Sequence, residues 1–407
     1  MMISDLPHHL LEEILSRVPA TTLRRLRTTC KQWNALLKDQ LFTEKHHRKA
    51  PKQPLLLMLK EFRICPLSVE LDLSVNAPSI EFKDALNLKK GSHSSSQDSD
   101  IMEVFHCEGL LLCVTRYNKL LVWNPLLGET KWIHHYKEKS SYALGYKNKE
   151  SCHRDYKILR YRQSPKREDN VDEFEIYEFS SDSWRFLDGI SLDYYIQAIG
   201  YVSLQGNTYW VASDRKDDYS MFLLSFDFTT ERFIRLNLPP VPSTMMLLSL
   251  VREEQISVLH MNHFQLKMEL WVTSNFGTET ALSWSKSFEV DLHVLDSERY
   301  PFFTTFLLDE DKKVVVCPGP SGLNFKNVVY IIGENDEYHK EIPYVRSTQE
   351  PWLSCIFNYV PSLVQIQQPT QTRKRKRRSK LEHAMLVTKK QEKKRRHSIH
   401  IETVNVD

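Results

Sequence analysis

A strand, a turn and a second strand with an aromatic residue recur in this chain about every fifty residues. The steps between Trp123, Tyr177, Phe226, Trp271 and Tyr330, the aromatic residues of the first strands, are 54, 49, 45 and 59 residues. The aromatic residues after the turns are Trp132, Trp184, Phe233, Trp284 and Tyr338. One such unit cannot bury both of its faces, so the aromatic side chains are expected to form a core between neighbouring units.

This period is typical of the four-strand blades of a propeller. From about residue 101 to residue 367, short alternating or apolar runs are separated by turn residues at intervals of roughly ten, as expected for successive β-strands. A twisted β-sandwich is the alternative. The pattern leaves open how many blades there are and whether they close into a ring.

Residues 3 to about 47 are predicted to form three short helices. Asp5 and Pro7 suit the first turn of a helix that begins near Leu6, and Thr21 or Thr22 can cap the helix after Pro19. Apolar residues recur at helical spacing in both. A segment of about forty-five residues is too small for its helices to bury all of these apolar residues against each other. The surplus apolar surface therefore packs either on a partner or on the chain's own β domain.

Two stretches of this helical segment resemble the F-box. They are Leu6-Pro7-x-x-Leu10-Leu11-x-x-Ile14-Leu15-x-Arg17-Val18-Pro19 and Leu23-x-x-Leu26-Arg27-x-x-Cys30-Lys31-x-Trp33. The resemblance favours a partner, and implies docking on a Skp1-like adaptor that links to cullin and RING subunits. The residues expected to dock are Leu6, Pro7, Leu10, Leu11, Ile14, Leu15, Pro19, Leu23, Leu26, Cys30 and Trp33.

The β-like segment resembles the plant F-box-associated domain of type 1, a propeller-like (kelch-like) fold. The motifs are His106-Cys107-x-Gly109-Leu110-Leu111-Leu112-Cys113, Val122-Trp123-Asn124-Pro125-x-x-Gly128 and Gly206-Asn207-Thr208-Tyr209-Trp210. The expected organisation is α+β and multidomain, with an F-box at 1–47, a linker with first strands and a polar loop at 48–100, an all-β domain at 101–367 and a tail at 368–407. The resemblance implies a substrate receptor of a ubiquitin ligase whose β domain holds a protein target.

The tail is strongly basic. Residues 369–407 hold 13 Lys+Arg and 4 Asp+Glu, a net charge of +9, while the rest of the chain carries −6. Such dense like charge favours disorder. Two clusters are typical of a two-part nuclear-import signal: Arg373, Lys374, Arg375, Lys376, Arg377 and Arg378, then Lys393, Lys394, Arg395 and Arg396. The alternative function is a nuclear, nucleic-acid-associated protein that binds through this tail. Without interleaved aromatic residues, base stacking by the tail is not expected.

The sequence offers no motif for catalysis. A nucleophile elbow, a P-loop, a dinucleotide fingerprint and a zinc-protease motif are all missing. The carboxylate pairs Glu173/Glu175 and Asp309/Asp311 are expected to be solvated surface. We therefore expect a non-catalytic ligase subunit without cofactor or metal.

The seven cysteines are scattered and odd in number, which indicates reduced thiols. A zinc site at His106, Cys107, Cys152 and His153 is disfavoured, because adjacent ligand pairs rarely point at one metal. No signal peptide or membrane-spanning run is recognisable, so the expected location is the nucleus and cytoplasm, without membrane association.

Overall fold

The computed structural model describes residues 7–71, 78–88, 100–134, 140–148, 154–163, 172–190, 192–216, 220–241, 245–262, 267–274, 282–292, 303–321, 326–334, 339–344 and 354–366. Among the described residues, those of 7–178 and 184–366 belong to one compact unit. The disorder predicted for the tail, with both basic clusters, concerns residues outside the described ones. No helix among the described residues is long and apolar enough to cross a membrane.

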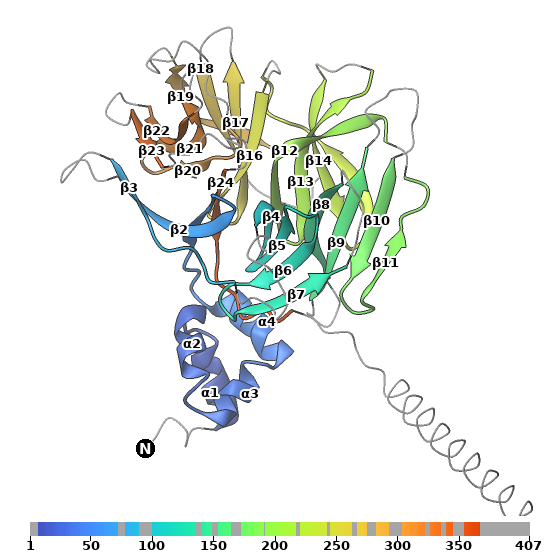
Figure 1. The fold of residues 1–407 in the computed structure, drawn as a ribbon, viewed down its shortest axis with the longest axis vertical. Helices are drawn as coiled ribbons and strands as arrows, with labels where there is room; N and C mark the ends of the chain where they lie inside the picture. Colours follow the sequence, from blue (N-terminus) through green and yellow to red (C-terminus); the bar gives the residue numbers. More distant parts are fainter. Residues whose placement is uncertain are drawn as a thin grey trace, which may run out of the picture. The chain divides into compact units, whose positions relative to one another are not determined.

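The described part of the N-terminal segment forms four helices (Figure 1), where the sequence predicted three. They are α1 (His8–Leu15), α2 (Ala20–Leu26), α3 (Lys31–Leu36) and α4 (Gln40–Lys49). The Asp39 carboxylate caps α4 by accepting a hydrogen bond from the Phe42 N–H at 2.9 Å. The predicted Thr21 or Thr22 cap is wrong, because Pro19 is the N-cap of α2 and both threonines lie inside the helix.

The described strands form six antiparallel four-stranded sheets. The strands of each sheet are named below in their spatial order, from the innermost strand to the outermost. The first three sheets are β4 (Ile101–Cys107), β5 (Leu110–Thr115), β6 (Leu120–Asn124), β7 (Glu129–Ile133); β8 (Ser141–Asn148), β9 (Arg154–Arg162), β10 (Glu173–Glu178), β11 (Ser183–Phe186); and β12 (Tyr194–Leu204), β13 (Asn207–Asp214), β14 (Met221–Asp227), β15 (Arg232–Leu236). The other three are β16 (Met245–Val251), β17 (Gln255–Asn262), β18 (Lys267–Thr273), β19 (Trp284–Asp291); β20 (Leu307–Asp309), β21 (Val314–Ser321), β22 (Lys326–Gly333), β23 (Lys340–Pro343); and β24 (Cys355–Tyr359), β1 (Leu55–Lys60), β2 (Arg63–Glu70), β3 (Ser79–Phe82).

These six sheets are the blades of a closed propeller, which confirms the propeller and rules out the sandwich. The ring closes in the sixth sheet, where β24 from the C-terminal side pairs with β1 from the N-terminal side, Leu57 opposite Phe357. Strands of the 48–100 segment thus belong to the propeller, and Ile101 begins the second sheet along the chain.

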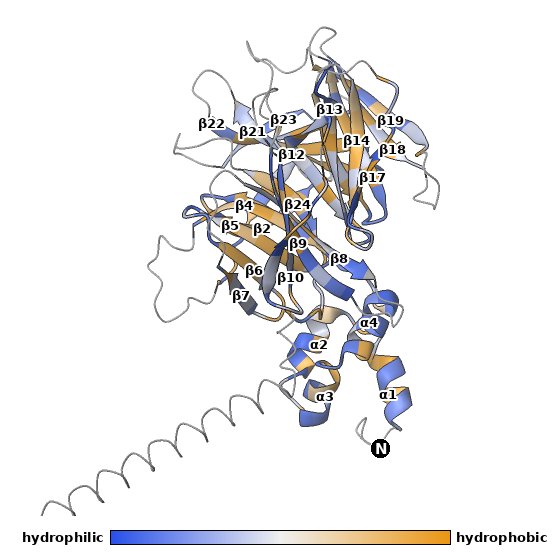
Figure 2. Ribbon diagram, turned by 90° about the vertical axis from the view of Figure 1, so that its right-hand side faces the viewer, coloured by the Kyte–Doolittle hydropathy of each residue, from blue (hydrophilic) through white to orange (hydrophobic). Residues whose placement is uncertain are grey.

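The repeating unit seen in the sequence is the pair of outer strands of five blades. Trp123 and Trp132 lie on β6 and β7, and Phe226 and Phe233 on β14 and β15. Trp123, Phe226 and Tyr330 are buried in clusters that join neighbouring blades, as predicted for the repeat aromatics. Tyr338 lies outside the described residues. Figure 2 shows the hydrophobic residues concentrated along the strands.

The chain after β24 connects the propeller to the helices. The Asn124 side-chain amide is buried and donates to the carbonyl oxygens of Ser362 and Val364, at 3.0 and 2.7 Å. Gly109 has φ +87°, and a Cβ there would lie 2.3 Å from the Ser362 Cβ, so this turn requires glycine. Leu363 then packs into the core of the helices. The C-terminal end of the propeller therefore anchors the N-terminal segment.

Candidate functional site

The four helices complete their core with residues of the propeller. Leu11 and Leu15 of α1 and Leu23 of α2 are buried with Leu126 and Leu363 from the β domain. Such a small helical segment lacks the volume for a core of its own, and the propeller provides the missing apolar surface. One side of the helices therefore packs on the chain's own β domain, which was one of the two alternatives from the sequence. The other alternative, packing on a partner, stays a prediction.

The residues predicted to dock are divided by this packing. Leu11, Leu15 and Leu23 are in the core, whereas Leu10 and Ile14 are 44% and 49% exposed one helical turn apart on α1. The remaining described members are Pro7, which is exposed, and Pro19, Leu26, Cys30 and Trp33, which are half-buried. Leu6 lies outside the described residues. The docking role of the set remains a prediction.

Leu41 is an exposed apolar residue of the helical segment that the sequence analysis missed. It is 72% exposed on α4, whose opposite side buries Phe42, Thr43 and His46. The Asp39 cap could have predicted this helix, because Asp followed by an apolar pair is a recognisable helix start. We define the apolar face as Leu10 and Ile14 of α1, and treat Leu41 separately.

Charges hold α1 to α4. The Glu13 carboxylate accepts from Lys49 Nζ at 2.7 Å and from Arg17 at 3.0 Å, and Lys45 lies 3.1 Å away. These cations, Lys49 above all, lower the pKa of Glu13 to about 2. The group is solvent-exposed, so it helps to orient the helices more than it stabilises them.

A mostly buried ion-pair network joins α4 to the propeller. Arg154, at the start of β9, lies 2.6 Å from the Glu108 carboxylate and 3.2 Å from that of Glu44 on α4. The Tyr146 hydroxyl donates to Glu108 at 2.7 Å, and His47 Nε2 lies 3.3 Å from the same carboxylate. We call Arg154, Glu108, Glu44, Tyr146 and His47 the junction network. It connects residues that are far apart in sequence, so no local pattern predicts it.

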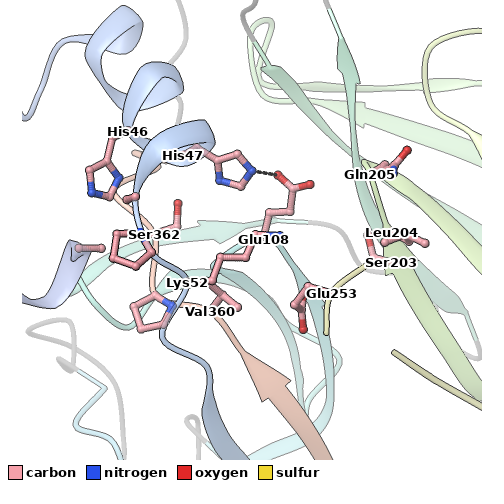
Figure 3. A pocket seen from close by; sticks show the side chains of 14 residues that line it. His46, His47, Lys52, Glu108, Ser203, Leu204, Gln205, Glu253, Val360 and Ser362 are labelled. Atoms are coloured by element: carbon pink, nitrogen blue, oxygen red, sulfur yellow. Dashed lines mark ion pairs between the residues drawn. The ribbon is translucent and has the colours of Figure 1, made fainter. Parts of the chain in front are cut away.

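A small cavity of about 60 Å³ lies beside the junction network, between α4 and the turns of the propeller (Figure 3). Glu253 contributes a carboxylate oxygen that is buried without a hydrogen-bond partner within the described structure. Burial raises the pKa of Glu253 to about 7; Lys52 opposes this shift and Glu108 adds to it. Burial also lowers the pKa of His47, on the same cavity, to about 4.

The Glu253→Gln variant should be more stable than the parent at alkaline pH. The folded-state pKa lies above the ordinary value of 4.5, so the parent loses stability as the pH rises from about 4.5 through about 7. We expect the variant to gain roughly 1–3 kcal/mol in unfolding free energy at pH 8 and little at pH 5. His47 titrates in both proteins, so its contribution cancels in the difference. Urea unfolding across this range checks the prediction, and a gain that is the same at pH 5 and pH 8 would contradict it.

Strand direction separates the two faces of the propeller. In an antiparallel blade, the turns after the first and third strands lie on one face, and the loops after the second and fourth lie on the other. Glu108 follows β4, and Leu126 follows β6; both contact the helical segment, so their face is the one that the helices cover. The turn between β5 and β6, with Tyr117 47% exposed, belongs to the opposite face.

Two family models match this combination of helices and blades. The model described as "F-box associated beta propeller domain" matches residues 55–366, and the one described as "F-box domain" matches residues 3–45. This chain is a member of the F-box-associated β-propeller family. Its propeller accordingly begins at Leu55, where β1 begins.

Relatives of this F-box protein match it over nearly its whole length. A putative F-box/kelch-repeat protein of Arabidopsis thaliana is 53% identical over 375 residues, which cover 90% of this chain and 98% of the relative. Putative F-box only protein 9 of the same plant is 50% identical over 374 residues, covering 90% and 96%. The similarity therefore includes both the F-box and the propeller.

The centre of the F-box protein's propeller contains a cavity of about 300 Å³, lined by residues of all six innermost strands or the segments just before or after them. Contributors include Glu103 on β4, Ser141 on β8, Tyr201 on β12, Ser249 on β16, Phe306 before β20 and Ile356 on β24. Glu253 and Ser203 line both this central cavity and the small one beside α4. The central cavity therefore reaches toward the F-box.

The candidate zinc ligands and the two carboxylate pairs from the sequence analysis can now be placed in the structure. No group of three potential metal ligands occurs within the described residues. His106 Nε2 accepts from the Gly109 N–H at 3.2 Å, and Cys152 and His153 are outside the described ranges.

The expectation that Glu173 and Glu175 are solvated surface is wrong in part. Glu175 is buried and lies 2.9 Å from the buried Arg160, so this carboxylate balances a core cation. Asp311 is exposed, as expected.

Proposed function

We propose that this F-box protein is a substrate-receptor subunit of a Skp1-cullin-F-box ubiquitin ligase. Its F-box binds a Skp1-like adaptor, and through it the cullin and RING subunits, while its propeller binds a protein target. The observation that carries the proposal is the apolar face. Leu10 and Ile14 remain exposed on a helix whose Leu11 and Leu15 already fill the core, so α1 has an apolar side that its own fold does not use.

The apolar face can supply much of the binding free energy. Full burial of a leucine or isoleucine stabilises by about 1.5–3 kcal/mol, and the half-exposed Leu10 and Ile14 have part of this left to gain. The helical segment also carries exposed basic residues, among them Arg24, Arg25 and Lys31. Exposed charges near an interface add little affinity but can speed association.

The target is proposed to bind at the face of the propeller opposite the F-box. In the blade of β4–β7, the F-box contacts the turns after the first and third strands through Glu108 and Leu126, whereas the turn between β5 and β6 lies on the opposite face. Loops on a rigid scaffold are common recognition elements. The role of the protein is then to hold a target lysine near a ubiquitin thioester, which raises the effective concentration of the reacting groups. No catalytic group of its own is needed.

Affinity capture from Arabidopsis extract tests this division of labour. The parent chain should retain a Skp1-like adaptor, a cullin and one or more target proteins. The Leu10→Asp, Ile14→Asp variant should lose the adaptor and the cullin and keep the targets. If adaptor and targets are lost together, the two functions are not separate, and if neither is lost the proposal fails.

We also propose that the basic tail directs part of the protein to the nucleus. The proposal rests on the clusters at 373–378 and 393–396. Replacing the ten basic residues of these clusters by Gln in a fluorescent fusion should reduce the nuclear-to-cytoplasmic ratio several-fold, because import receptors recognise the charges. A matched variant with three Lys→Gln changes at 380, 389 and 390 serves as the control. An unchanged ratio in the ten-residue variant would contradict this role.

A further inference from the structure

The central cavity of the propeller combines negative charge with apolar walls. The residues that line it include two carboxylates, Glu103 and Glu253, and none of them is Lys or Arg. His106 also lines it, and burial lowers the pKa of this imidazole to about 4, so the ring is neutral at physiological pH. The cavity therefore offers anionic groups without a balancing cation among its described lining residues.

Of these two carboxylates, Glu103 lies nearer to the face of the propeller opposite the F-box. It is the third residue of β4, a strand that begins at the face opposite the F-box and ends at the turn containing Glu108. Within the described residues, no hydrogen bond or ion pair is recorded for its carboxylate, and partial desolvation by the cavity walls raises its pKa. Glu103 is exposed by its surface area although it lines the cavity, so its carboxylate is accessible to a ligand that enters from this face. Carboxylates with a shifted pKa are more common in binding sites than in purely structural positions.

The backbone of the inner strands is irregular at this cavity. The pairing of β4 with β5 shifts register between Ile101 and Glu103, and that of β12 with β13 shifts between Ile196 and Tyr201. Gly200, in the second irregular stretch, has φ +74° and lines the cavity. Bulges turn side chains away from the regular strand alternation. Here they occur in two of the strands that form the cavity wall.

Aromatic rings and hydroxyl groups make up much of the remaining wall. Phe105 and Tyr201 stack with ring centroids 4.6 Å apart, and Phe306 and Phe357 also line the cavity. Aromatic faces attract organic cations, and a carboxylate in a partly desolvated site strengthens that preference. The volume of about 300 Å³ is at the lower end of the range for small-molecule sites.

We propose that the central cavity binds an organic ammonium group on an apolar stem, with Glu103 as its anionic partner. A free amine or a lysine side chain of a bound protein would present the same chemistry. A hard metal ion is a poorer match, because it needs several converging oxygen ligands, and the described residues contain no such group. An anion would meet two carboxylates without a cation.

Three probes of similar size and different charge test the proposal with the full chain: phenethylammonium, 2-phenylethanol and 3-phenylpropionate. Isothermal titration at pH 7.5 should give the tightest binding for phenethylammonium. Glu103→Gln should weaken it by about tenfold or more, as expected for the loss of a charged partner. Glu103→Asp should retain part of the affinity. Glu81→Gln, an exposed site on the outermost strand β3, should leave it unchanged.

Nα-acetyl-lysine methylamide distinguishes the two sources of the ammonium group. Binding at least as tight as that of phenethylammonium assigns the cavity to a protein lysine, and much weaker binding assigns it to a free amine. Equal binding of the three aromatic probes would overturn the proposal. So would an unchanged phenethylammonium affinity in a Glu103→Gln variant with the circular dichroism spectrum of the parent.

Discussion

The Leu10→Asp, Ile14→Asp variant is expected to bind a purified Skp1-like adaptor roughly 100-fold more weakly than the parent, or not at all. Both side chains are about half exposed on α1, so a carboxylate at either position is tolerated in the free protein. In the complex, each would place an unpaired charge in an apolar interface. Surface plasmon resonance on the purified proteins measures the difference.

The matched control is Phe186→Asp, Ile234→Asp. These residues are 61% and 41% exposed on β11 and β15, outermost strands of the propeller, so the chemical change and the exposure are comparable. We expect the control to bind the adaptor like the parent, and both variants to unfold at nearly the parent's temperature. Parent-like adaptor binding by the α1 variant would remove the apolar face from the interface.

The Arg154→Met variant is expected to lose about 3–5 kcal/mol of stability. Arg154 has a 7% exposed side chain and lies within ion-pair distance of Glu108 and Glu44, so its removal leaves two carboxylates in mostly buried surroundings with one cation fewer. Because one carboxylate belongs to α4 and the other to the propeller, the loss weakens the attachment of the F-box to the β domain. Urea unfolding monitored by tryptophan fluorescence measures the change.

Two comparisons separate the charge effect from lost packing. Arg252→Met removes a cation that pairs with Asp311 at 2.8 Å with both side chains well exposed, and should cost less than about 1 kcal/mol. Adding Glu108→Gln to Arg154→Met should recover part of the stability, because one unpaired carboxylate is then neutral. A small loss for Arg154→Met, equal to that for Arg252→Met, would show that the junction network is not a stabilising element.

The propeller could be predicted from the sequence because its repeat is local. Four blades have an aromatic residue on both the third and the fourth strand, such as Trp123 and Trp132, and a fifth has Tyr330 on its third strand. The sixth blade does not show this signal. Its third strand, β2, has no aromatic residue, and its innermost strand, β24, comes from the other end of the chain. Closure depends on a pairing between distant segments that a period does not reveal.

The candidate site could be predicted only in outline. The motif identifies the F-box, but the packing partners decide that Leu11 is buried while its neighbour Leu10 is exposed. Leu126 and Leu363 supply that packing from distant positions. Likewise, Glu253 and Glu103 become unusual only when the folded chain brings their carboxylates to the wall of one cavity, since neither belongs to a sequence motif.

The central claim is that the exposed side of the F-box recruits a Skp1-like adaptor. Size-exclusion chromatography with light scattering, on the purified full chain mixed with a purified Arabidopsis Skp1-like protein, tests it most directly. The account predicts a one-to-one complex with the parent chain and separate peaks with the Leu10→Asp, Ile14→Asp variant. Separate peaks with the parent chain, across the Skp1-like proteins of Arabidopsis, would contradict it.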